Sequence, residues 1–282
     1  MQATLGDILD SHRTGRAIVM GILNVTPDSF SDGGEFLDPS AAVAQAQAMV
    51  EQGADLIDVG AESTRPGSER VGPGEQIRRI EGVLPALAEL GVLVSIDTTS
   101  SAVADYALRA GAAIVNDVSA GREDSKMLPL AARRGAAVVL MHMLGYPKTM
   151  QAAPAYADVV AEVREFLAER VAAAEAAGVP RGRCIVDPGI GFGKTARHNL
   201  SLLAGTGELA SLGLPVLVGP SRKRFIGEVT GEAVPARRLG GTIAACLACR
   251  RGGATIFRVH DVAPLVQALA MAEAIDRAGG QT

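Results

Sequence analysis

Eight short apolar runs recur along this chain, and most of them end in a polar side chain. The runs are rich in Val, Ile and Leu, and longer segments rich in Ala and in charged residues separate them. This alternation is typical of parallel β-strands joined by helices. Eight such units predict an α/β fold, a (β/α)₈ TIM barrel that forms a single domain over residues 1–282. The strands are expected near residues 17–25, 54–60, 92–98, 113–118, 136–142, 184–188, 215–219 and 254–259.

The polar side chains at the ends of the runs predict where the function lies. In a (β/α)₈ barrel the carboxyl ends of the strands meet at one mouth, and the loops that follow them build the active site. We therefore expect polar residues that are far apart in the sequence to converge at this mouth. They are Asn24, Asp58, Asp97, Asn116, His142, Asp187, Ser221, Lys223, Arg258 and His260.

Length and composition fit a single barrel and do not favour nucleic-acid binding. The chain has 282 residues, and such a barrel typically takes about 250. A formal net charge of −4 gives no broad basic surface, and an aromatic content of 3% without tryptophan gives no stacking platform for single strands. No signal-peptide pattern and no apolar run of membrane-spanning length are found, so we expect a cytoplasmic protein that does not bind membranes.

The cysteines do not predict a disulfide framework. The chain has three, Cys184, Cys246 and Cys249. The last two form a C-x-x-C pattern inside an expected helix, and further zinc ligands at a suitable spacing are missing. Two thiols packed in the core are therefore the preferred interpretation.

Two turn-rich segments follow the first and second strands and are candidate lids over the mouth. The first, residues 24–34, contains Phe30, and an aromatic side chain in a polar loop usually has something to cover. Its Asn and Asp side chains are also ordinary turn formers, so the segment alone leaves a structural role open. The second, residues 62–67, contains Arg65, which is suited either to clamp an anion or to bridge surface carboxylates.

Two carboxylates and an amide at strand ends indicate the chemistry of the ligand. Asp97, Asn116 and Asp187 each end an apolar run, where a lone carboxylate is costly unless it is paired. A structural ion pair with Lys or Arg is one interpretation. The other is a flat heterocycle with several N–H donors on one edge, and with Lys223 bound to a carbonyl or ring nitrogen on the opposite edge.

The last two units predict an anion site. Residues 219–224 and 258–261 each join a strand to a helix start, and barrels often bind phosphate between these two loops. A solvated helix start is the alternative, although cations are disfavoured at a helix N-terminus. The glycine-rich stretch 187–195 lacks the spacing of a P-loop and of a dinucleotide fingerprint. Its glycines are expected to pass close to a flat ligand, with Phe192 against it.

Seven motifs, taken together, resemble the dihydropteroate synthase family of the folate pathway. They are NVTPDSFSDGG, ESTRPG, SIDT, NDVS, DPGIGFGK, GPSRKRF and RVHD, in this order over nearly the whole chain, and the first and sixth are highly specific. The resemblance implies a homodimeric TIM barrel. It implies condensation of 6-hydroxymethyl-7,8-dihydropterin diphosphate with 4-aminobenzoate to 7,8-dihydropteroate and diphosphate, with Mg²⁺ present. Sulfonamides act on the family as mimics of the aminobenzoate.

The resemblance also implies roles for individual residues around the pterin and its diphosphate. The residues that match the family's pterin contacts are Asp97, Asn116, Asp187 and Lys223. Those that match contacts to the diphosphate-bearing substrate are Thr64, Arg258 and His260. Asn24 matches the residue near the metal.

The aminobenzoate pocket is expected to form from the two loops, where the matching residues are Phe30, Arg65 and Pro66. Asp32 is expected to face the developing cation, and the aminobenzoate carboxylate is expected near Ser221 and Arg224. The remaining residues expected to bind substrate are Met141 and Phe192. The chain departs from the family at Leu144, where members often have Gln, which leaves the role of that loop open.

The residues and the resemblance together predict a dissociative displacement. Asp97 and Asp187 hold the ring and favour the positive charge, while Arg258, His260 and Mg²⁺ take up the charge of the departing diphosphate. Three alternatives are a pterin-dependent methyltransferase, a Schiff-base aldolase that uses Lys223, and a non-catalytic pterin-binding paralogue. The methyltransferase does not need the two anion loops, and the paralogue is expected to lack Asn24, Arg65 or Lys223.

Overall fold

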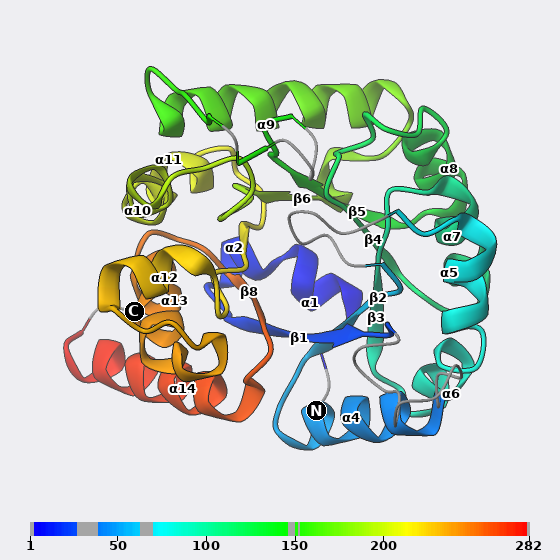
Figure 1. Ribbon diagram of the computed structural model, residues 1–282, viewed down its shortest axis with the longest axis horizontal. Coiled ribbons are helices and arrows are strands. Elements are labelled where there is room, and N and C mark those ends of the chain that lie inside the picture. The colour runs from blue at the N-terminus through cyan, green and yellow to red at the C-terminus, as the bar shows by residue number, and fades with distance from the viewer. Residues whose placement is uncertain (1–2, 27–38, 63–69, 146–149, 152, 281–282) are drawn as a thin grey trace.

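The computed structural model describes residues 3–26, 39–62, 70–145, 150–151 and 153–280. Eight parallel strands form one sheet in the order β6-β5-β4-β3-β2-β1-β8-β7, and a parallel bridge between Val186 and Val216 joins its two edges. The sheet thus closes into the expected barrel (Figure 1). The strands are β1 (Ile18–Asn24), β2 (Leu56–Gly60), β3 (Leu93–Asp97), β4 (Ile114–Asp117), β5 (Ala137–Met141), β6 (Cys184–Asp187), β7 (Leu217–Val218) and β8 (Ile256–Val259).

Each strand lies within its predicted range and is shorter than that range. The difference is largest at β7, where a strand over 215–219 was expected and only Leu217–Val218 has strand geometry. Val216 makes the bridge to β6, so the barrel closes through a single bridge at this point. The residues that follow each strand belong to the loops at the mouth and not to the sheet, which explains why the strands end early.

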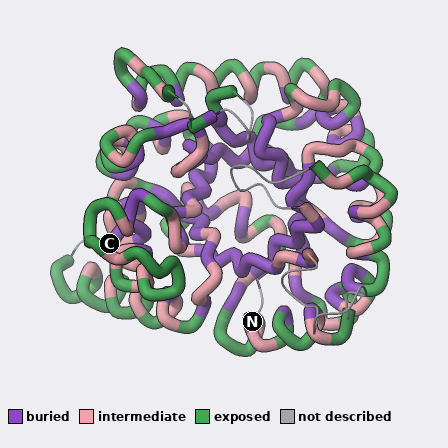
Figure 2. The backbone as a smooth tube through the Cα atoms, viewed as in Figure 1, coloured by how far each residue is buried: buried purple, intermediate pink, exposed green. Residues whose placement is uncertain are grey.

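Helices surround the barrel. The outer ones are α4 (Pro39–Glu51), α5 (Pro73–Ile80), α6 (Leu84–Glu89), α7 (Ser101–Arg109), α8 (Met127–Arg134), α9 (Val159–Ala176), α10 (Ala196–Ala204), α11 (Thr206–Ala210), α12 (Arg224–Thr230), α13 (Leu239–Arg251) and α14 (Val262–Ala278), with short 3₁₀ turns at Arg181–Arg183 and Pro235–Arg237. Local signals set their ends: Asp158 caps α9 by accepting from two backbone N–H groups, and Gly135 ends α8 at φ 64°. Figure 2 shows buried residues along the strands and on the inner helix faces, with exposed residues on the outer faces.

Two short helices, α1 (Leu5–Leu9) and α2 (Ser11–Thr14), were not expected from the sequence. In Figure 1 α1 lies inside the ring of strands. Its residue Ile8 is fully buried and belongs to a cluster with residues from the amino-terminal parts of the strands, among them Ile18, Leu56 and Ile256. The N-terminal segment therefore plugs the amino-terminal end of the barrel.

The late helices hold the C-x-x-C pair. Cys246 and Cys249 lie in α13 and are fully buried as free thiols, as expected. Burial raises the pKa of both thiols, to about 11 for Cys249, so neither is poised as a thiolate. Among the described residues, no helix is long and apolar enough to cross a membrane.

Candidate active site

Strand register brings the predicted acceptors together at the mouth of the barrel. Asp97 at the end of β3 lies beside Gly60 of β2 on one side and beside Asn116 of β4 on the other. Asp58 pairs with Ser95, two residues before Asp97, so its side chain lies one layer deeper in the same interior. Asp187, at the end of β6, is in register with Met141 of β5. Backbone pairing thus places these side chains at the carboxyl end of the barrel.

A buried ion network occupies the β2–β3–β8 side of this interior. Arg258 donates from Nε to Asp58 Oδ2 at 2.6 Å and from Nη2 to Asp97 Oδ2 at 2.9 Å. Asn116 Nδ2 donates to the same Asp58 oxygen at 3.0 Å. Asp58 is fully buried, and its other oxygen, Oδ1, has no hydrogen-bond partner among the described residues. An unpaired buried carboxylate oxygen is costly, so this atom is available to a donor on a ligand.

The network changes the protonation of its members. Burial raises the pKa of Asp97 to about 7, against the opposing effect of Arg258 and with a further rise caused by Asp58. Burial alone would lower the pKa of Arg258, but Asp58 and Asp97 raise it above its ordinary value. Arg258 thus stays charged, while Asp97 titrates near neutral pH.

Asp187 and Lys223 form a second group on the β6–β7 side. Asp187 Oδ1 accepts from the backbone N–H of Gly189 at 2.7 Å, and Lys223 Nζ donates to the carbonyl of Ile190. The ammonium also lies 4.4 Å from the centre of the Phe192 ring, a cation–π contact. Burial raises the pKa of Asp187 and lowers that of Lys223 to about 8.

A small apolar cluster provides a wall beside these groups. Met141 at the end of β5 is buried with Val118, Met143 and Met150, and Phe192 packs against them. Methionine side chains adapt to the shape of a neighbour and make favourable contacts with rings. Met141 and Phe192 therefore lie where a flat heterocycle would pack, with acceptors at its edge.

The rim formed by the loops after β7 and β8 brings Ser221 and His260 together but not Arg224. Ser221 Oγ lies 3.0 Å from His260 Nδ1 and accepts from the His260 N–H, so these two residues meet as predicted. Arg222 is held by Asp261, which neutralises it. Arg224 begins α12 with a side chain that is 85% exposed, and it pairs with Glu228 of its own helix. The structure thus does not bring Arg224 to the other site residues.

Several predicted residues cannot be placed. Phe30, Asp32, Thr64, Arg65 and Pro66 lie outside the residues that the structure describes. The base of the second loop is described: Glu62 accepts from the Val71 N–H at 2.8 Å and from Gln76 Nε2 at 3.2 Å.

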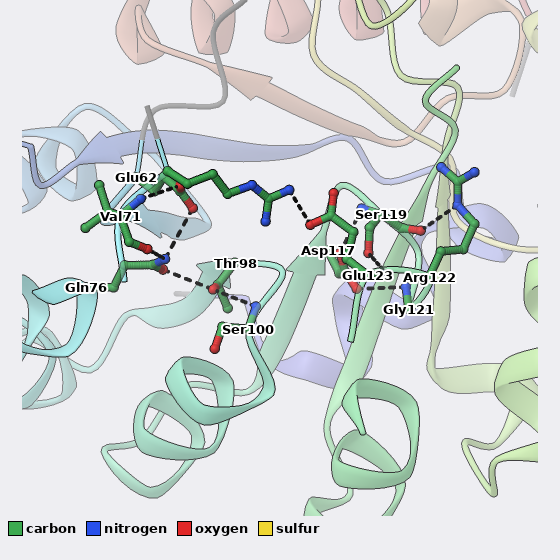
Figure 3. A network of polar contacts seen from close by, with 11 residues as sticks. Glu62, Val71, Gln76, Thr98, Ser100, Asp117, Ser119, Gly121, Arg122 and Glu123 are labelled. Carbon is green, nitrogen blue, oxygen red and sulfur yellow. Dashed lines mark hydrogen bonds and ion pairs between the residues drawn. The ribbon is translucent and has the colours of Figure 1, made fainter. Parts of the chain in front are cut away.

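Next to this loop base lies a polar network, shown in Figure 3. Glu123 accepts from Arg70, and Asp117 Oδ1 and Oδ2 accept from the N–H groups of Ser119 and Gly121, both at 2.7 Å. Thr98 Oγ1 donates to Gln76 Oε1 at 3.2 Å. These contacts join the loops after β2, β3 and β4, so they shape one side of the mouth.

Asn24 lies at the end of β1, in register with Gly60. A Cβ atom at Gly60 would lie 3.6 Å from Asn24 Oδ1 and 3.6 Å from Asp97 Cβ, so the absence of a side chain at Gly60 leaves room between them. Among the described residues, no three His, Cys, Asp or Glu side chains gather as a metal cluster. Within the described part of the chain, the Asn24 amide oxygen and the Asp97 side chain thus lie on either side of Gly60.

Two functional features of the interior were missed by sequence reasoning. Asp58 was recognised as a strand-end polar residue but not as the buried partner of Arg258 and Asn116. Its signal is a carboxylate inside the apolar run ADLIDVG. The second feature is a contact between Lys194 Nζ and His142 Nδ1, 2.9 Å apart and both buried.

Comparisons with known proteins agree with this geometry. A family model described as "Pterin binding enzyme" matches residues 20–260. The dihydropteroate synthase of Synechocystis sp. is 48% identical, over 93% of this chain and 91% of the relative. The structure of Xanthomonas albilineans dihydropteroate synthase with 4-aminobenzoic acid aligns with a TM-score of 0.87 at 48% identity, over 93% of each chain.

A second structure of the Xanthomonas albilineans enzyme, in complex with 7,8-dihydropteroate, aligns with a TM-score of 0.83 at 45% identity, over 93% of this chain and 94% of that one. The similarity spans the whole barrel, including all eight strand ends that build the mouth. This chain therefore belongs to the pterin-binding enzyme family and, within it, to the dihydropteroate synthases, which are transferases of folate biosynthesis.

Proposed function

We propose that this chain condenses 6-hydroxymethyl-7,8-dihydropterin diphosphate with 4-aminobenzoate, with release of diphosphate, by a dissociative displacement in the mouth of the barrel. The observation that carries the proposal is the set of buried acceptors on neighbouring strands, Asp58, Asp97, Asn116 and Asp187, beside a cationic arginine. A pterin has N–H donors along one edge and an apolar face, and both find partners here.

The pterin ring is proposed to bind with its donor edge toward Asp187, Asn116 and Asp97. Each of these side chains is at most 9% exposed, so hydrogen bonds to them form away from competing water. Met141 and Phe192 face the ring, and Lys223 contributes a donor for its carbonyl or ring nitrogen. Carboxylates on this side also stabilise the positive charge that develops on the pterin methylene carbon as its C–O bond breaks.

The departing diphosphate is proposed to lie toward β8. Arg258 is charged at all relevant pH, and His260 and Ser221 form the neighbouring rim. Thr64 is proposed to join them from the second loop. Positive charge at this position lowers the energy of the transition state because negative charge grows on the leaving oxygen.

Mg²⁺ fits the position beside Asn24. This ion prefers oxygen ligands and usually keeps waters and substrate phosphates around one or two protein groups. The side-chain oxygen of Asn24, at the end of β1, is one such protein group. When bound, Mg²⁺ would neutralise charge on the diphosphate, and Asn24 would hold it through Oδ1.

The aminobenzoate is proposed to bind above the pterin, between the two loops and the β7 side of the rim. Phe30, Arg65 and Pro66 are proposed to shape this pocket, with Asp32 facing the developing cation. Ser221, 6% exposed, is the rim residue placed to meet the aminobenzoate carboxylate. No strong base is needed, since the aromatic amine is neutral at pH 7, and positioning supplies much of the rate.

Substitution of Asp187 tests the pterin site. Asp187→Asn removes the charge while it keeps the size, and hydrogen bonds to charged groups contribute about 1.5–3 kcal/mol, so pterin affinity should fall by about 10- to 100-fold. Isothermal calorimetry with the free pterin measures this. Asp105→Asn, in the surface pair with Arg134, is the matched control and should bind pterin normally. Unchanged affinity in Asp187→Asn would contradict the proposed site.

A turnover assay separates the reaction from its alternatives. Release of diphosphate together with 7,8-dihydropteroate should require both substrates, which a methyltransferase or a binding paralogue would not show. Borohydride should trap no substrate carbonyl on Lys223, because its Nζ is engaged by Ile190 O and Phe192. Failure to form 7,8-dihydropteroate from the two substrates, or a trapped lysine adduct, would count against the proposal.

We propose further that two copies form a homodimer through the late helices. Met271 and Ile275 of α14 are 61% and 58% exposed, and they lie four residues apart, so they share one face of the helix. Sedimentation should give a dimer for the parent chain and a monomer for the variant with Met271→Glu and Ile275→Glu. An unchanged sedimentation coefficient in that variant would place the interface elsewhere.

A further inference from the structure

Lys194 is a buried lysine that the proposed reaction does not use. It is 3% exposed, and its Nζ lies 2.9 Å from His142 Nδ1, 2.9 Å from the Phe192 carbonyl oxygen and 3.4 Å from the His142 carbonyl oxygen. An ammonium group has three N–H donors, and these three acceptors match them in number. None of the three is a carboxylate. Burial lowers the pKa of Lys194 to about 7, and the nearby Asp187 carboxylate opposes this shift. A lysine at this depth is costly, so its presence calls for an explanation.

The contacts join two segments of the mouth. His142 follows β5, and Phe192 lies in the loop of residues 188–195 between β6 and α10. The two segments pass so close that only glycine fits at position 189: it has φ 65°, and a Cβ there would lie 1.9 Å from the His142 carbonyl oxygen. Lys194 therefore hydrogen-bonds to His142 at a point where the two backbone segments are already in close contact.

Aromatic and hydroxyl contacts hold the same segments from the outer side. The His142 ring meets Phe166 of α9 edge-on, with centroids 4.8 Å apart. Tyr156 lies 5.9 Å from His142 by ring centroids and donates from its hydroxyl to the Gly193 carbonyl at 2.9 Å. The Phe192 carbonyl accepts from Lys194 and the Gly193 carbonyl accepts from Tyr156, so two successive peptides of the loop are held by hydrogen bonds.

The same loop carries the groups that meet the pterin. Gly189 donates its N–H to Asp187 Oδ1, and Ile190 accepts from Lys223 Nζ. The Phe192 ring lies under the Lys223 ammonium. Asp187 and Lys223 therefore depend on the position of the loop backbone, which in turn depends on Lys194.

We propose that Lys194 and His142 form a clamp that holds the loop of residues 188–193 in place and so positions Asp187 and Lys223 for the pterin. Lys194 is a positioning residue: it acts through the loop and does not touch the substrate. This inference rests on the proposed function, because its test measures how well the enzyme recognises the pterin.

The alternative role is fold stability alone. A residue that only stabilises the fold would, on substitution, lower the melting temperature and leave the KM values of the folded enzyme unchanged. The clamp predicts an effect on one substrate. Steady-state kinetics with the pterin diphosphate and with 4-aminobenzoate, varied separately, distinguishes these outcomes, with the melting temperature measured for every variant.

Four variants test the clamp. Lys194→Met keeps the length of the chain without its donors, His142→Phe keeps a ring without the acceptor, His142→Asn keeps an acceptor without the ring, and the fourth combines Lys194→Met with His142→Phe. Lys194→Met and His142→Phe should each raise the KM for the pterin diphosphate about tenfold, the effect of about one lost hydrogen bond, and the KM for 4-aminobenzoate by less than about threefold. The double variant should be no worse than Lys194→Met alone, because Lys194→Met already removes the contact that His142→Phe removes. His142→Asn should stay within about threefold of the parent enzyme.

Ser11→Ala is the matched control. It removes a buried hydrogen bond of 2.8 Å to Thr255 near the plugged end of the barrel, so it should lower the melting temperature without a change in either KM. It shows whether lost stability by itself alters KM.

Three results would overturn the clamp: an unchanged pterin KM in Lys194→Met and His142→Phe, an equal rise of both KM values, or His142→Asn as impaired as His142→Phe. If Lys194→Met does not fold, the two His142 variants decide the question. A parent enzyme without turnover would instead contradict the proposed function, so the two failures are distinguishable.

Discussion

The two ends of the barrel are built from the same strands and differ in almost every physical respect. At the amino-terminal end, Ile8 of α1 packs among Ile18, Leu56 and Ile256, and all four are fully buried. At the carboxyl end, the interior holds an arginine between two carboxylates. One end gains stability from apolar burial, whereas the other keeps charges out of water at a cost.

The apolar plug and the ion network are separated by only two residues along a strand. On β2, Leu56 belongs to the apolar plug and Asp58 to the ion network, and both are fully buried. Two residues of a strand span about 7 Å. Buried charges such as Asp58 lower the stability of the fold and are typical of functional sites. The apolar packing around Ile8 offsets part of this loss of stability. The contrast predicts that substitutions at the two ends will separate stability from activity.

Removal of Arg258 should have the largest effect. Arg258→Met leaves Asp58 and Asp97 buried without their cation, and loss of one partner of a buried ion pair typically costs about 3–5 kcal/mol of unfolding free energy. Turnover should fall by at least about 100-fold, because the charge that we propose to stabilise the leaving group is lost as well. Urea unfolding and the diphosphate-release assay measure the two losses. A variant as stable as the parent would show that the carboxylates are neutral without Arg258.

Truncation in the plug should affect stability alone. Ile8→Ala opens a cavity in a fully buried cluster, which typically costs about 2–5 kcal/mol. Because Ile8 lies at the opposite end from the mouth, kcat and both KM values should stay at parent levels below the melting temperature. Calorimetric melting and steady-state kinetics check this. A changed KM in this variant would mean that the two ends are coupled, and the contrast between them would fail.

The pH dependence of pterin binding should follow Asp97. Its pKa, near 7 in the folded chain, lies above the ordinary 3.8, so the folded state binds the proton more tightly than the unfolded state does. The stability that this proton contributes is complete below pH 3.8 and is lost as the pH rises through 7. Pterin binding has the opposite slope: affinity should fall about tenfold per pH unit below pH 7, as the acceptor is protonated.

Calorimetric titrations between pH 5.5 and about 8 measure this slope. Asp97→Asn should bind the pterin more weakly. Its pterin affinity should no longer depend on pH in this range, because the asparagine side chain does not titrate. Equal slopes in the parent and in Asp97→Asn would assign the titration to another group, with Lys223, whose pKa is near 8, as the first to examine.

The sequence predicted the barrel and the mouth better than the contacts inside them. Strand runs and their polar ends repeat locally, so Asp97, Asn116 and Asp187 were found by pattern. The partner of Asp58 was not, because Arg258 is 200 residues away and no local pattern joins them. The plug was missed because α1 has five residues, too few for helical periodicity to be visible.

The sequence motifs did not reveal the contacts of two basic residues. Lys194 belongs to the glycine-rich stretch, whose spacing excludes a P-loop, and Arg224 belongs to the basic run of the expected anion site. The partner of Lys194 lies 52 residues away, so no local pattern joins the two, whereas the partner of Arg224 lies one helical turn later and is visible in the i,i+4 spacing. His142 holds Lys194, and Asp261 and Glu228 hold Arg222 and Arg224.

Arg224 therefore provides the smallest predicted effect. Its side chain is 85% exposed and pairs with Glu228 one turn later, and such surface pairs contribute about 0.3–0.5 kcal/mol. Arg224→Ala should change the KM for 4-aminobenzoate by less than about threefold, whereas Ser221→Ala should raise it by about tenfold through loss of a buried hydrogen-bonding group. Steady-state kinetics with varied 4-aminobenzoate compares the two. If Arg224→Ala is the more impaired variant, the arginine must reach into the pocket when substrate is bound, and the rim would extend one residue further than the contacts described above.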